Sequence, residues 1–147
     1  MTVAASGTAS RSFPARLDCA AEADAWLKQQ TETLGIDRDA TYALEVCLEE
    51  IFANLVLHGK ASHATLRLTR KPTTAQLDIV DDGLLFDPTQ APARRVVGPL
   101  AEAEIGGLGI GLIQRLATTI AYRCDGGHNH LSLEFALTPS GKEHQGR

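Results

Sequence analysis

Three polar side chains stand four residues apart inside the otherwise apolar segment 42–59: Glu50, Asn54 and His58. On a helix, this spacing places them along one line of the surface. The apolar residues around them recur at the three- and four-residue intervals of a buried helical stripe: Leu44, Cys47, Leu48, Ile51, Phe52, Leu55 and Val56. A carboxylate and a carboxamide beside so much apolar surface are costly unless neighbouring groups or a ligand satisfy them. We take the ligand as our working hypothesis.

A second candidate for binding chemistry follows an alternating apolar segment, 75–80, which predicts a strand. Asp81 ends this strand and Gly83 comes two residues later. A buried carboxylate at a strand end is a good acceptor for the exocyclic amino group of adenine, and a glycine there would let the base approach the backbone closely. The alternative is an ordinary turn, because Asp-Gly pairs commonly form turns. Asp82 is expected to face solvent.

A third candidate is the glycine-rich segment 106–111, which opens a predicted helix over 108–119. Backbone N–H groups at a helix start can hold phosphate, helped by the helix dipole. A dinucleotide-binding loop would require an apolar strand just before the glycines, and the sequence there is AEAEI. There is no GK[ST] phosphate loop either. Phosphate contact is therefore preferred over a purely structural glycine turn.

Three segments resemble, in the same order, the N, G1 and G2 boxes of the GHKL ATP-binding fold. They are Glu50-Ile-Phe-Ala-Asn54, Asp81-Asp-Gly83-Leu-Leu-Phe86-Asp-Pro88 and Gly106-Gly-Leu-Gly109-Ile-Gly111-Leu112. The match is closest to the stand-alone anti-sigma factor/serine-protein kinases. DDGLLFDP resembles their D-x-G-x-x-F-D-P signature, and EIGGLGIGLIQRLA resembles their compact G2 box. The resemblance extends from Phe13 to Leu137. Each box alone is weak, but the three in order are a specific signal.

The resemblance implies a role for each residue of these boxes. Asn54 would be the protein ligand of Mg²⁺, and Glu50 the catalytic base that accepts a proton from a serine hydroxyl. The alternatives are an asparagine that caps a neighbouring backbone group and a structural carboxylate paired with Arg or Lys. Residues expected to contact the nucleotide are Asn54, Asp81, Gly83, Phe86, Gly106, Gly107, Leu108, Gly109, Ile110 and Gly111.

Two features of the sequence leave the resemblance open at particular positions. The segment from Asp87 to Ile105 corresponds to the ATP lid of the family, where Arg94 and Arg95 would either reach phosphate or a partner, or be solvated. Related proteins often carry a Thr near the start of the last strand, close to the adenine site. The residues present here are Asn129, His130 and Ser132. The sequence does not decide which of them takes that place.

The elements needed to position these groups follow from period and turn signals. We expect a strand over 11–17 with Pro14 at an edge, a helix capped by Asp18 that stops at Gly35, and a second helix, capped by Asp39, that ends at Gly59. The chain then continues with a hairpin (64–69 and 75–80) and a loop. The helix 108–119 and a last hairpin (120–124 and 130–137) follow. This order predicts an α+β fold, a two-layer sandwich of the Bergerat type with a mixed sheet and helices on one face. Residues 11–138 would form one domain, with flexible tails at 1–10 and 139–147.

Composition excludes several classes of function. The 147 residues carry a net charge of −4 and a pI near 5.7, which argues against a nucleic-acid-binding surface. No apolar run is long enough to span a bilayer, and the N-terminal segment lacks the pattern of a secretory signal. Cys19, Cys47 and Cys124 have no metal-ligand spacing. We therefore expect a reduced, cytoplasmic protein.

The resemblance implies an ATP- and Mg²⁺-dependent protein-serine kinase that acts as a homodimer. It would sequester a sigma factor or similar target, and would phosphorylate a STAS-type antagonist on serine. An alternative is a nucleotide-gated binding module with little or no kinase activity. A histidine kinase catalytic domain would need a phospho-acceptor helix pair, for which residues 1–40 are too short. A gyrase-type ATPase would need a transducer domain after residue 137.

Overall fold

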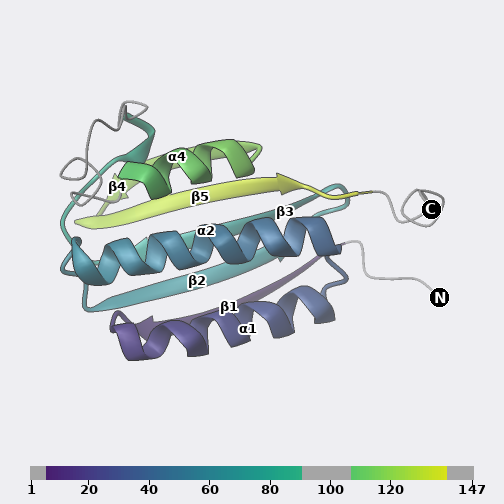
Figure 1. Ribbon diagram of the computed structural model, residues 1–147, viewed down its shortest axis with the longest axis horizontal. Coiled ribbons are helices and arrows are strands. Elements are labelled where there is room, and N and C mark those ends of the chain that lie inside the picture. The colour runs from purple at the N-terminus through teal and green to yellow at the C-terminus, as the bar shows by residue number, and fades with distance from the viewer. Residues whose placement is uncertain (1–5, 91–106, 139–147) are drawn as a thin grey trace.

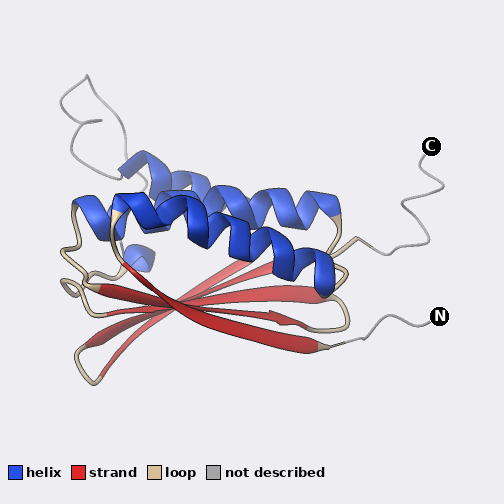
Figure 2. Cartoon of the chain, turned by 90° about the horizontal axis from the view of Figure 1, so that it is seen from below, coloured by secondary structure: helices blue, strands red, loops and turns tan. Residues whose placement is uncertain are grey.

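One antiparallel sheet, covered on one face by helices, forms the molecule (Figure 2). The computed structural model describes residues 6–90 and 107–138. The strands lie in the order β1-β2-β3-β5-β4. In chain order, the elements are β1 (Gly7–Pro14), the 3₁₀ turn η1 (Leu17–Cys19), α1 (Ala20–Thr33), α2 (Arg38–Leu57), β2 (His63–Arg70), β3 (Thr74–Asp81), the 3₁₀ turn η2 (Pro88–Gln90), α4 (Gly107–Leu116), β4 (Thr119–Asp125) and β5 (His128–Ala136).

The predicted α+β class and the single helical layer are confirmed, but the expectation of a mixed sheet is wrong. Every neighbouring pair of strands in the described sheet is antiparallel. The chain crosses from β3 through α4 to β4, which runs in the same direction as β3. It then turns back at Gly126 and Gly127, whose φ values of +64° and +80° suit a tight hairpin. Because β5 returns between β3 and β4, no parallel pair forms.

The first strand begins earlier than the sequence indicated. Its backbone pairs with β2 from Gly7 opposite Arg70 to Pro14 opposite His63. The last four residues of the expected tail therefore belong to the sheet, because backbone pairing does not depend on apolar alternation. The strand also stops at Pro14 instead of residue 17, so Leu17 lies in η1, where it is 57% exposed. The edge position predicted from Pro14 is confirmed.

Both predicted helix caps are wrong: α1 has no side-chain cap, and the cap of α2 lies two residues earlier than expected. Asp18 lies in η1, where it pairs with Arg16 at 2.6 Å, and no side chain caps α1. Asp37, not Asp39, caps α2, because its Oδ2 accepts a hydrogen bond from the Ala40 N–H at 3.2 Å. Its Oδ1 accepts from the Thr138 N–H at 3.0 Å, so the cap also holds the chain after β5.

The core lies between the sheet and the helices, with α2 between α1 and α4 (Figure 1). The predicted apolar stripe of α2 is buried there from Leu44 to Phe52, and Leu55 and Val56 are partly buried against the same core. Burial, and to a smaller extent the charge of Glu50, raises the pKa of the Cys47 thiol to about 12. Cys47 therefore acts as a small hydrophobic residue, as predicted. Among the described residues, no helix is both long enough and apolar enough to cross a membrane.

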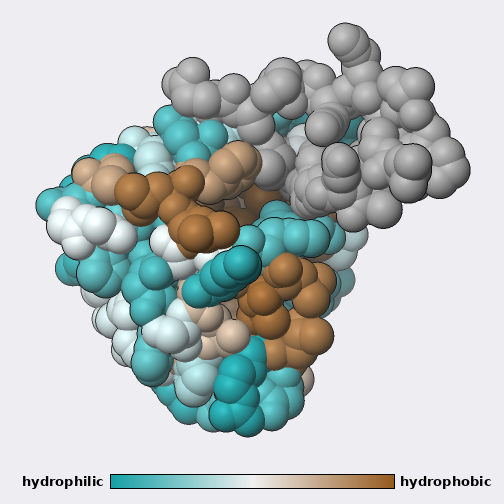
Figure 3. Space-filling view, turned by 90° about the vertical axis from the view of Figure 1, so that its left-hand side faces the viewer, coloured by the Kyte–Doolittle hydropathy of each residue, from teal (hydrophilic) through white to brown (hydrophobic). Residues whose placement is uncertain are grey.

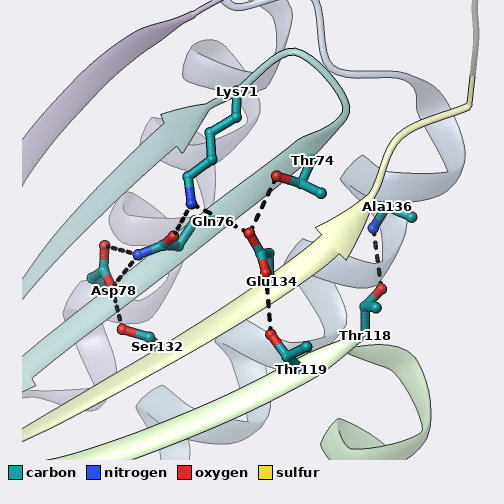
Figure 4. A network of polar contacts seen from close by, with 9 residues as sticks. All are labelled: Lys71, Thr74, Gln76, Asp78, Thr118, Thr119, Ser132, Glu134 and Ala136. Carbon is teal, nitrogen blue, oxygen red and sulfur yellow. Dashed lines mark hydrogen bonds and ion pairs between the residues drawn. The ribbon is translucent and has the colours of Figure 1, made fainter.

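The opposite face of the sheet carries a hydrogen-bonded polar network instead (Figure 4). The Lys71 ammonium donates to Gln76 Oε1 at 2.7 Å and lies 3.3 Å from Glu134 Oε2. The hydrogen bond to Lys71 is the main reason that the pKa of Glu134 lies below its usual value. Farther along the same face, Ser132 donates to Asp78 across the β3–β5 pair. The sheet therefore has one apolar face and one polar face.

Candidate nucleotide-binding site

A cavity of about 390 Å³ lies where α2 and β3 end. Its walls come from the last turns of α2, the segment after β3, α4, and strands β4 and β5. It is lined by Ile51, Asn54, Leu55, His58, Gly59, Ile79, Asp81, Leu84, Leu85, Phe86, Pro88, Ile113, Gln114, Ile120, Tyr122, Asn129 and Leu131. Figure 3 views this end of the molecule, where apolar side chains gather on the surface. A largely apolar cavity with a few polar groups is the usual form of a small-molecule site.

Asp81 supplies the carboxylate in the cavity wall. It is the last residue of β3, and its inward-facing position leaves it only 5% exposed. Its Oδ1 accepts hydrogen bonds from the Gly83 N–H at 2.8 Å and from Asn129 Nδ2 at 3.0 Å. Among the described residues, no group donates to Oδ2. One oxygen of a nearly buried carboxylate is thus available to a donor on a ligand, which fits the role predicted for Asp81.

Asn129 is a site residue that the sequence did not single out. It pairs with Asp81 across β3 and β5 and is 6% exposed. Its Nδ2 donates to Asp81 Oδ1 and, at 2.9 Å, to the Leu84 carbonyl. The sequence offered three candidates for this neighbourhood, and only the register between β3 and β5 selects Asn129.

Asn54 contributes a carboxamide to the cavity wall from the last turns of α2. It lines the cavity and is half-buried, and its side chain forms no hydrogen bond with any described residue. Its backbone carbonyl accepts from the N–H groups of His58 and Gly59 in the helix end. The alternative of a carboxamide that caps neighbouring backbone therefore has no partner in the described part of the chain. The Asn54 amide oxygen remains available to a ligand.

Glu50 is not in the cavity wall, although Asn54 and His58 are. It lies one turn earlier on α2, is half-buried, and forms no ion pair with a described residue. The alternative of a carboxylate paired with Arg or Lys thus finds no partner among the residues of 6–90 and 107–138. The structure brings Asn54, Asp81 and Phe86 together around one cavity, with Glu50 beside it.

Gly83 is required by the packing of two segments, and the close approach of a base to its backbone stays a prediction. A Cβ at this position would lie 2.4 Å from the Gly59 carbonyl oxygen and 3.1 Å from Ala61. The same Gly59 carbonyl accepts a hydrogen bond from the Leu84 N–H at 2.7 Å. The glycine therefore lets the segment after β3 pack against the segment after α2. Gly83 itself does not line the cavity.

Asp82 joins the same two segments from outside the cavity. It is exposed, as expected, yet its carboxylate accepts from the N–H groups of Ser62 at 2.8 Å and His63 at 3.1 Å, and from the Ser62 hydroxyl. The Ser62 hydroxyl is the main reason that the pKa of Asp82 lies well below its usual value, and the two N–H groups add to the effect. Asp82 and Gly83 together fix the wall of the cavity.

The glycine-rich box begins a helix, as predicted. Gly107, Leu108, Gly109, Ile110 and Gly111 form the first half of α4. The first four N–H groups of any helix lack partners within it, so this end offers donors to an anion. Gly106, Arg94 and Arg95 lie outside the described residues.

The side chains of the cavity suit a hard divalent cation that takes most of its ligands from nucleotide phosphates and water. Among the described residues, no group of three or more His, Cys, Asp or Glu side chains could hold a metal ion. Mg²⁺ usually retains several waters and binds through one or two protein oxygens plus substrate phosphates. The amide oxygen of Asn54 in the cavity wall fits that pattern.

Comparison with known proteins gives a consistent assignment. Residues 13–135 match the histidine kinase-like ATPase domain. The chain is 35% identical over 104 residues to the serine/threonine-protein kinase BtrW of Bordetella bronchiseptica. The matched stretch covers 67% of this chain and 72% of BtrW. The chain therefore belongs to the histidine kinase-like ATPase family, as its three boxes indicated, and membership implies ATP binding and kinase activity at the family level.

The fold agrees with a solved structure, that of the RsbU and RsbW domains of Rv1364c from Mycobacterium tuberculosis. The likeness has a TM-score of 0.63 at 14% identity and covers 90% of this chain. Our chain spans about a third of that mycobacterial chain, since the likeness covers 33% of it. At this identity the likeness concerns the fold alone.

Proposed function

We propose that this protein is an ATP-dependent protein-serine kinase that regulates a partner by binding it. The observation that carries the proposal is the buried Asp81 carboxylate, which lines a nucleotide-sized cavity with one oxygen free of described donors. Membership of the ATPase family and the 35% identity to a serine/threonine-protein kinase support the same assignment.

The proposal gives a role to four side chains of the first two boxes and to the backbone of the third. Asp81 accepts a hydrogen bond from the 6-amino group of adenine, while Phe86 contacts the nucleotide from the cavity wall. Asn54 would hold Mg²⁺ through its amide oxygen, and the cation would supply neutralisation of phosphate charge. The N-terminal turn of α4 binds the phosphates with its backbone N–H groups. Glu50 accepts the proton of the serine hydroxyl that attacks the γ-phosphate.

The proposed partners rest on the resemblance of the three boxes to those of the anti-sigma factor/serine-protein kinases. We infer that the protein sequesters a sigma factor or a similar regulatory target. We further infer that it phosphorylates a STAS-type antagonist on serine, and acts as a homodimer in the cytoplasm. The 35% identity to BtrW, a serine/threonine-protein kinase, supports the reaction type. The acceptor residue and the target are proposals for this chain.

A second candidate function is a nucleotide-gated binding module with little or no kinase activity. One observation favours it: Glu50, the proposed base, does not line the cavity that would hold ATP. In such a module, ATP would set the affinity for the partner, and phosphate transfer would be absent. The two candidates share the same nucleotide site and differ only in turnover.

Calorimetric titration with Mg-ATP, combined with a phosphate-transfer assay on a STAS protein from the same organism, tests both candidates. We expect wild type to bind ATP, Asn54→Ala to weaken binding, and Glu50→Gln to bind normally but transfer no phosphate. Glu49→Gln, an exposed neighbour on α2, is the control and should retain both properties. Binding without transfer by wild type would favour the module. A folded wild type that binds no ATP would reject the nucleotide site.

A further inference from the structure

We propose that Asn129 is the positioning residue that sets the base selectivity of this site, by fixing the orientation of the Asp81 carboxylate so that one oxygen faces the base. The inference rests on the proposed function, since it concerns the same nucleotide site. It assigns a role to a side chain from the last strand, outside all three sequence boxes.

The hydrogen bonds of Asn129 leave it only one orientation. A carboxamide has two donor hydrogens and two acceptor positions. Asn129 uses both donors, on Asp81 Oδ1 at 3.0 Å and on the Leu84 carbonyl at 2.9 Å. Its Oδ1 accepts from the Phe86 N–H at 3.1 Å and from the Tyr122 hydroxyl at 2.5 Å. Turning the amide over would place donors against donors, so this arrangement is held fixed.

Asn129 in turn fixes the carboxylate of Asp81. With Asn129 and the Gly83 N–H both on Oδ1, rotation of the carboxylate would break two hydrogen bonds. Oδ2 is therefore the oxygen presented to a ligand. Asn129 also holds the backbone of Leu84 and Phe86, two residues of the cavity wall. One side chain thus orients both the polar group and the apolar wall that a base would meet.

Tyr122 completes this arrangement from β4. Its hydroxyl donates to Asn129, and both residues line the cavity. Burial, and then the nearby Cys124, Asp87 and Asp81, raise the pKa of the Tyr122 hydroxyl. The hydroxyl therefore stays protonated and remains a donor at neutral pH. The Phe86 N–H acts on the pKa of Tyr122 in the opposite direction, but more weakly than burial and these neighbours.

The fixed carboxylate predicts a specific preference among purines. Oδ2 can only accept, so it favours a base with an amino group at position 6 and disfavours one with a carbonyl oxygen there. A site built to hydrogen-bond a substrate group rejects analogues that lack it more strongly than an apolar site does. If Asn129 is removed, Oδ1 loses one of its two donors and the carboxylate gains freedom to rotate. Selectivity should then fall more than overall affinity.

The test measures the affinities for ATP and purine riboside triphosphate, which lacks only the 6-amino group, in wild type, Asn129→Ala and Tyr122→Phe. We expect wild type to prefer ATP by at least about tenfold. The preference should fall to about twofold or less in Asn129→Ala, with a smaller fall in Tyr122→Phe. Ser132→Ala is a matched control, because Ser132 bonds Asp78 across the same two strands but on the polar face of the sheet (Figure 4). It should keep the full preference.

An equal loss of affinity for both nucleotides, with the preference unchanged, would show that Asn129 is only structural and would overturn the inference. A wild type that binds neither nucleotide would instead reject the proposed function. Circular dichroism and thermal melting identify any variant that does not fold. If Asn129→Ala does not fold, Tyr122→Phe decides, because it removes one hydroxyl and keeps the ring. An unchanged preference in Tyr122→Phe would then count against the inference.

Discussion

At the scale of single residues, the chemistry depends on how the two oxygens of Asp81 differ. Oδ1 is occupied by two protein donors, and Oδ2 has no donor among the described residues. A carboxylate split in this way presents one defined acceptor to the cavity. Its neighbours, rather than its residue type alone, make it a selective group.

This asymmetry predicts the effect of Asp81→Asn. The amide oxygen would take the Oδ1 position, because Gly83 and Asn129 both donate there. The amide NH₂ would then meet the 6-amino group of adenine, donor against donor. We expect ATP affinity to fall by about 10- to 100-fold, and the preference to move towards inosine triphosphate, whose 6-carbonyl can accept. Isothermal titration with both nucleotides checks this, and an unchanged order of preference would contradict it.

Asp82 gives a prediction in stability and pH. Its folded-state pKa is lowered, so its stabilising contribution is full above the unfolded pKa, near 4, and is lost as pH falls through the folded value. At pH 7, we expect Asp82→Asn to lower the free energy of unfolding by about 1 kcal/mol, the usual net value of a hydrogen bond. The difference in the free energy of unfolding between wild type and Asp82→Asn should shrink as pH falls below about 4. Urea unfolding at several pH values measures it, and a gap that widens with acid would contradict the assignment.

At the scale of elements, the site depends on two segments that pack together: 58–62 after α2, and 82–86 after β3. The Leu84 N–H donates a hydrogen bond to the Gly59 carbonyl, and this close packing leaves no room for a side chain at position 83. The segment that follows the N box and the G1 box itself are therefore coupled through backbone contacts. Displacement of one segment would displace the other.

A matched pair of glycine substitutions tests this coupling. Gly83→Ala would place a Cβ 2.4 Å from the Gly59 oxygen, and should lower the free energy of unfolding by about 1 to 3 kcal/mol. In Gly111→Ala, no described atom lies within 4 Å of the added Cβ, and alanine is the better helix former. That variant should be unchanged or more stable by up to about 1 kcal/mol. Thermal unfolding of both variants measures the difference, and similar losses in the two would argue against a steric origin.

At the scale of the whole molecule, the sheet separates two environments. Leu133 is fully buried against the helices, whereas Glu134, the next residue on β5, belongs to the polar network of the open face. The side chains of a strand alternate between faces, so adjacent residues contribute to stability in very different ways. Burial of apolar surface, not ion pairing, should dominate stability.

Two substitutions compare these faces. Leu133→Ala should lower the free energy of unfolding by about 2 to 5 kcal/mol, because it leaves a cavity in the core. Lys71→Ala, which removes the ion pair with Glu134, should lower it by less than about 1 kcal/mol, because the pair is partly exposed. Urea denaturation with a common m-value compares them. Equal losses would mean that the polar face contributes far more than its exposure suggests.

The sequence alone determined the features that depend on neighbours along the chain. The apolar stripe of α2, the alternation in β2 and β3, and the glycines that end α1 and open α4 predicted those elements, because period and turn signals act over a few residues. The order of the three boxes identified the family. These features also placed Asn54 and Asp81 among the residues of the site.

The tertiary structure decided what depends on contacts between distant segments. Insertion of β5 between β3 and β4 made the sheet antiparallel, and its register placed Asn129 beside Asp81, 48 residues away. The clash that requires Gly83 involves Gly59, and Glu50 lies outside the cavity although it shares a helix with Asn54. Local patterns cannot specify such pairings, because register and packing are set by the free energy of the whole assembled core.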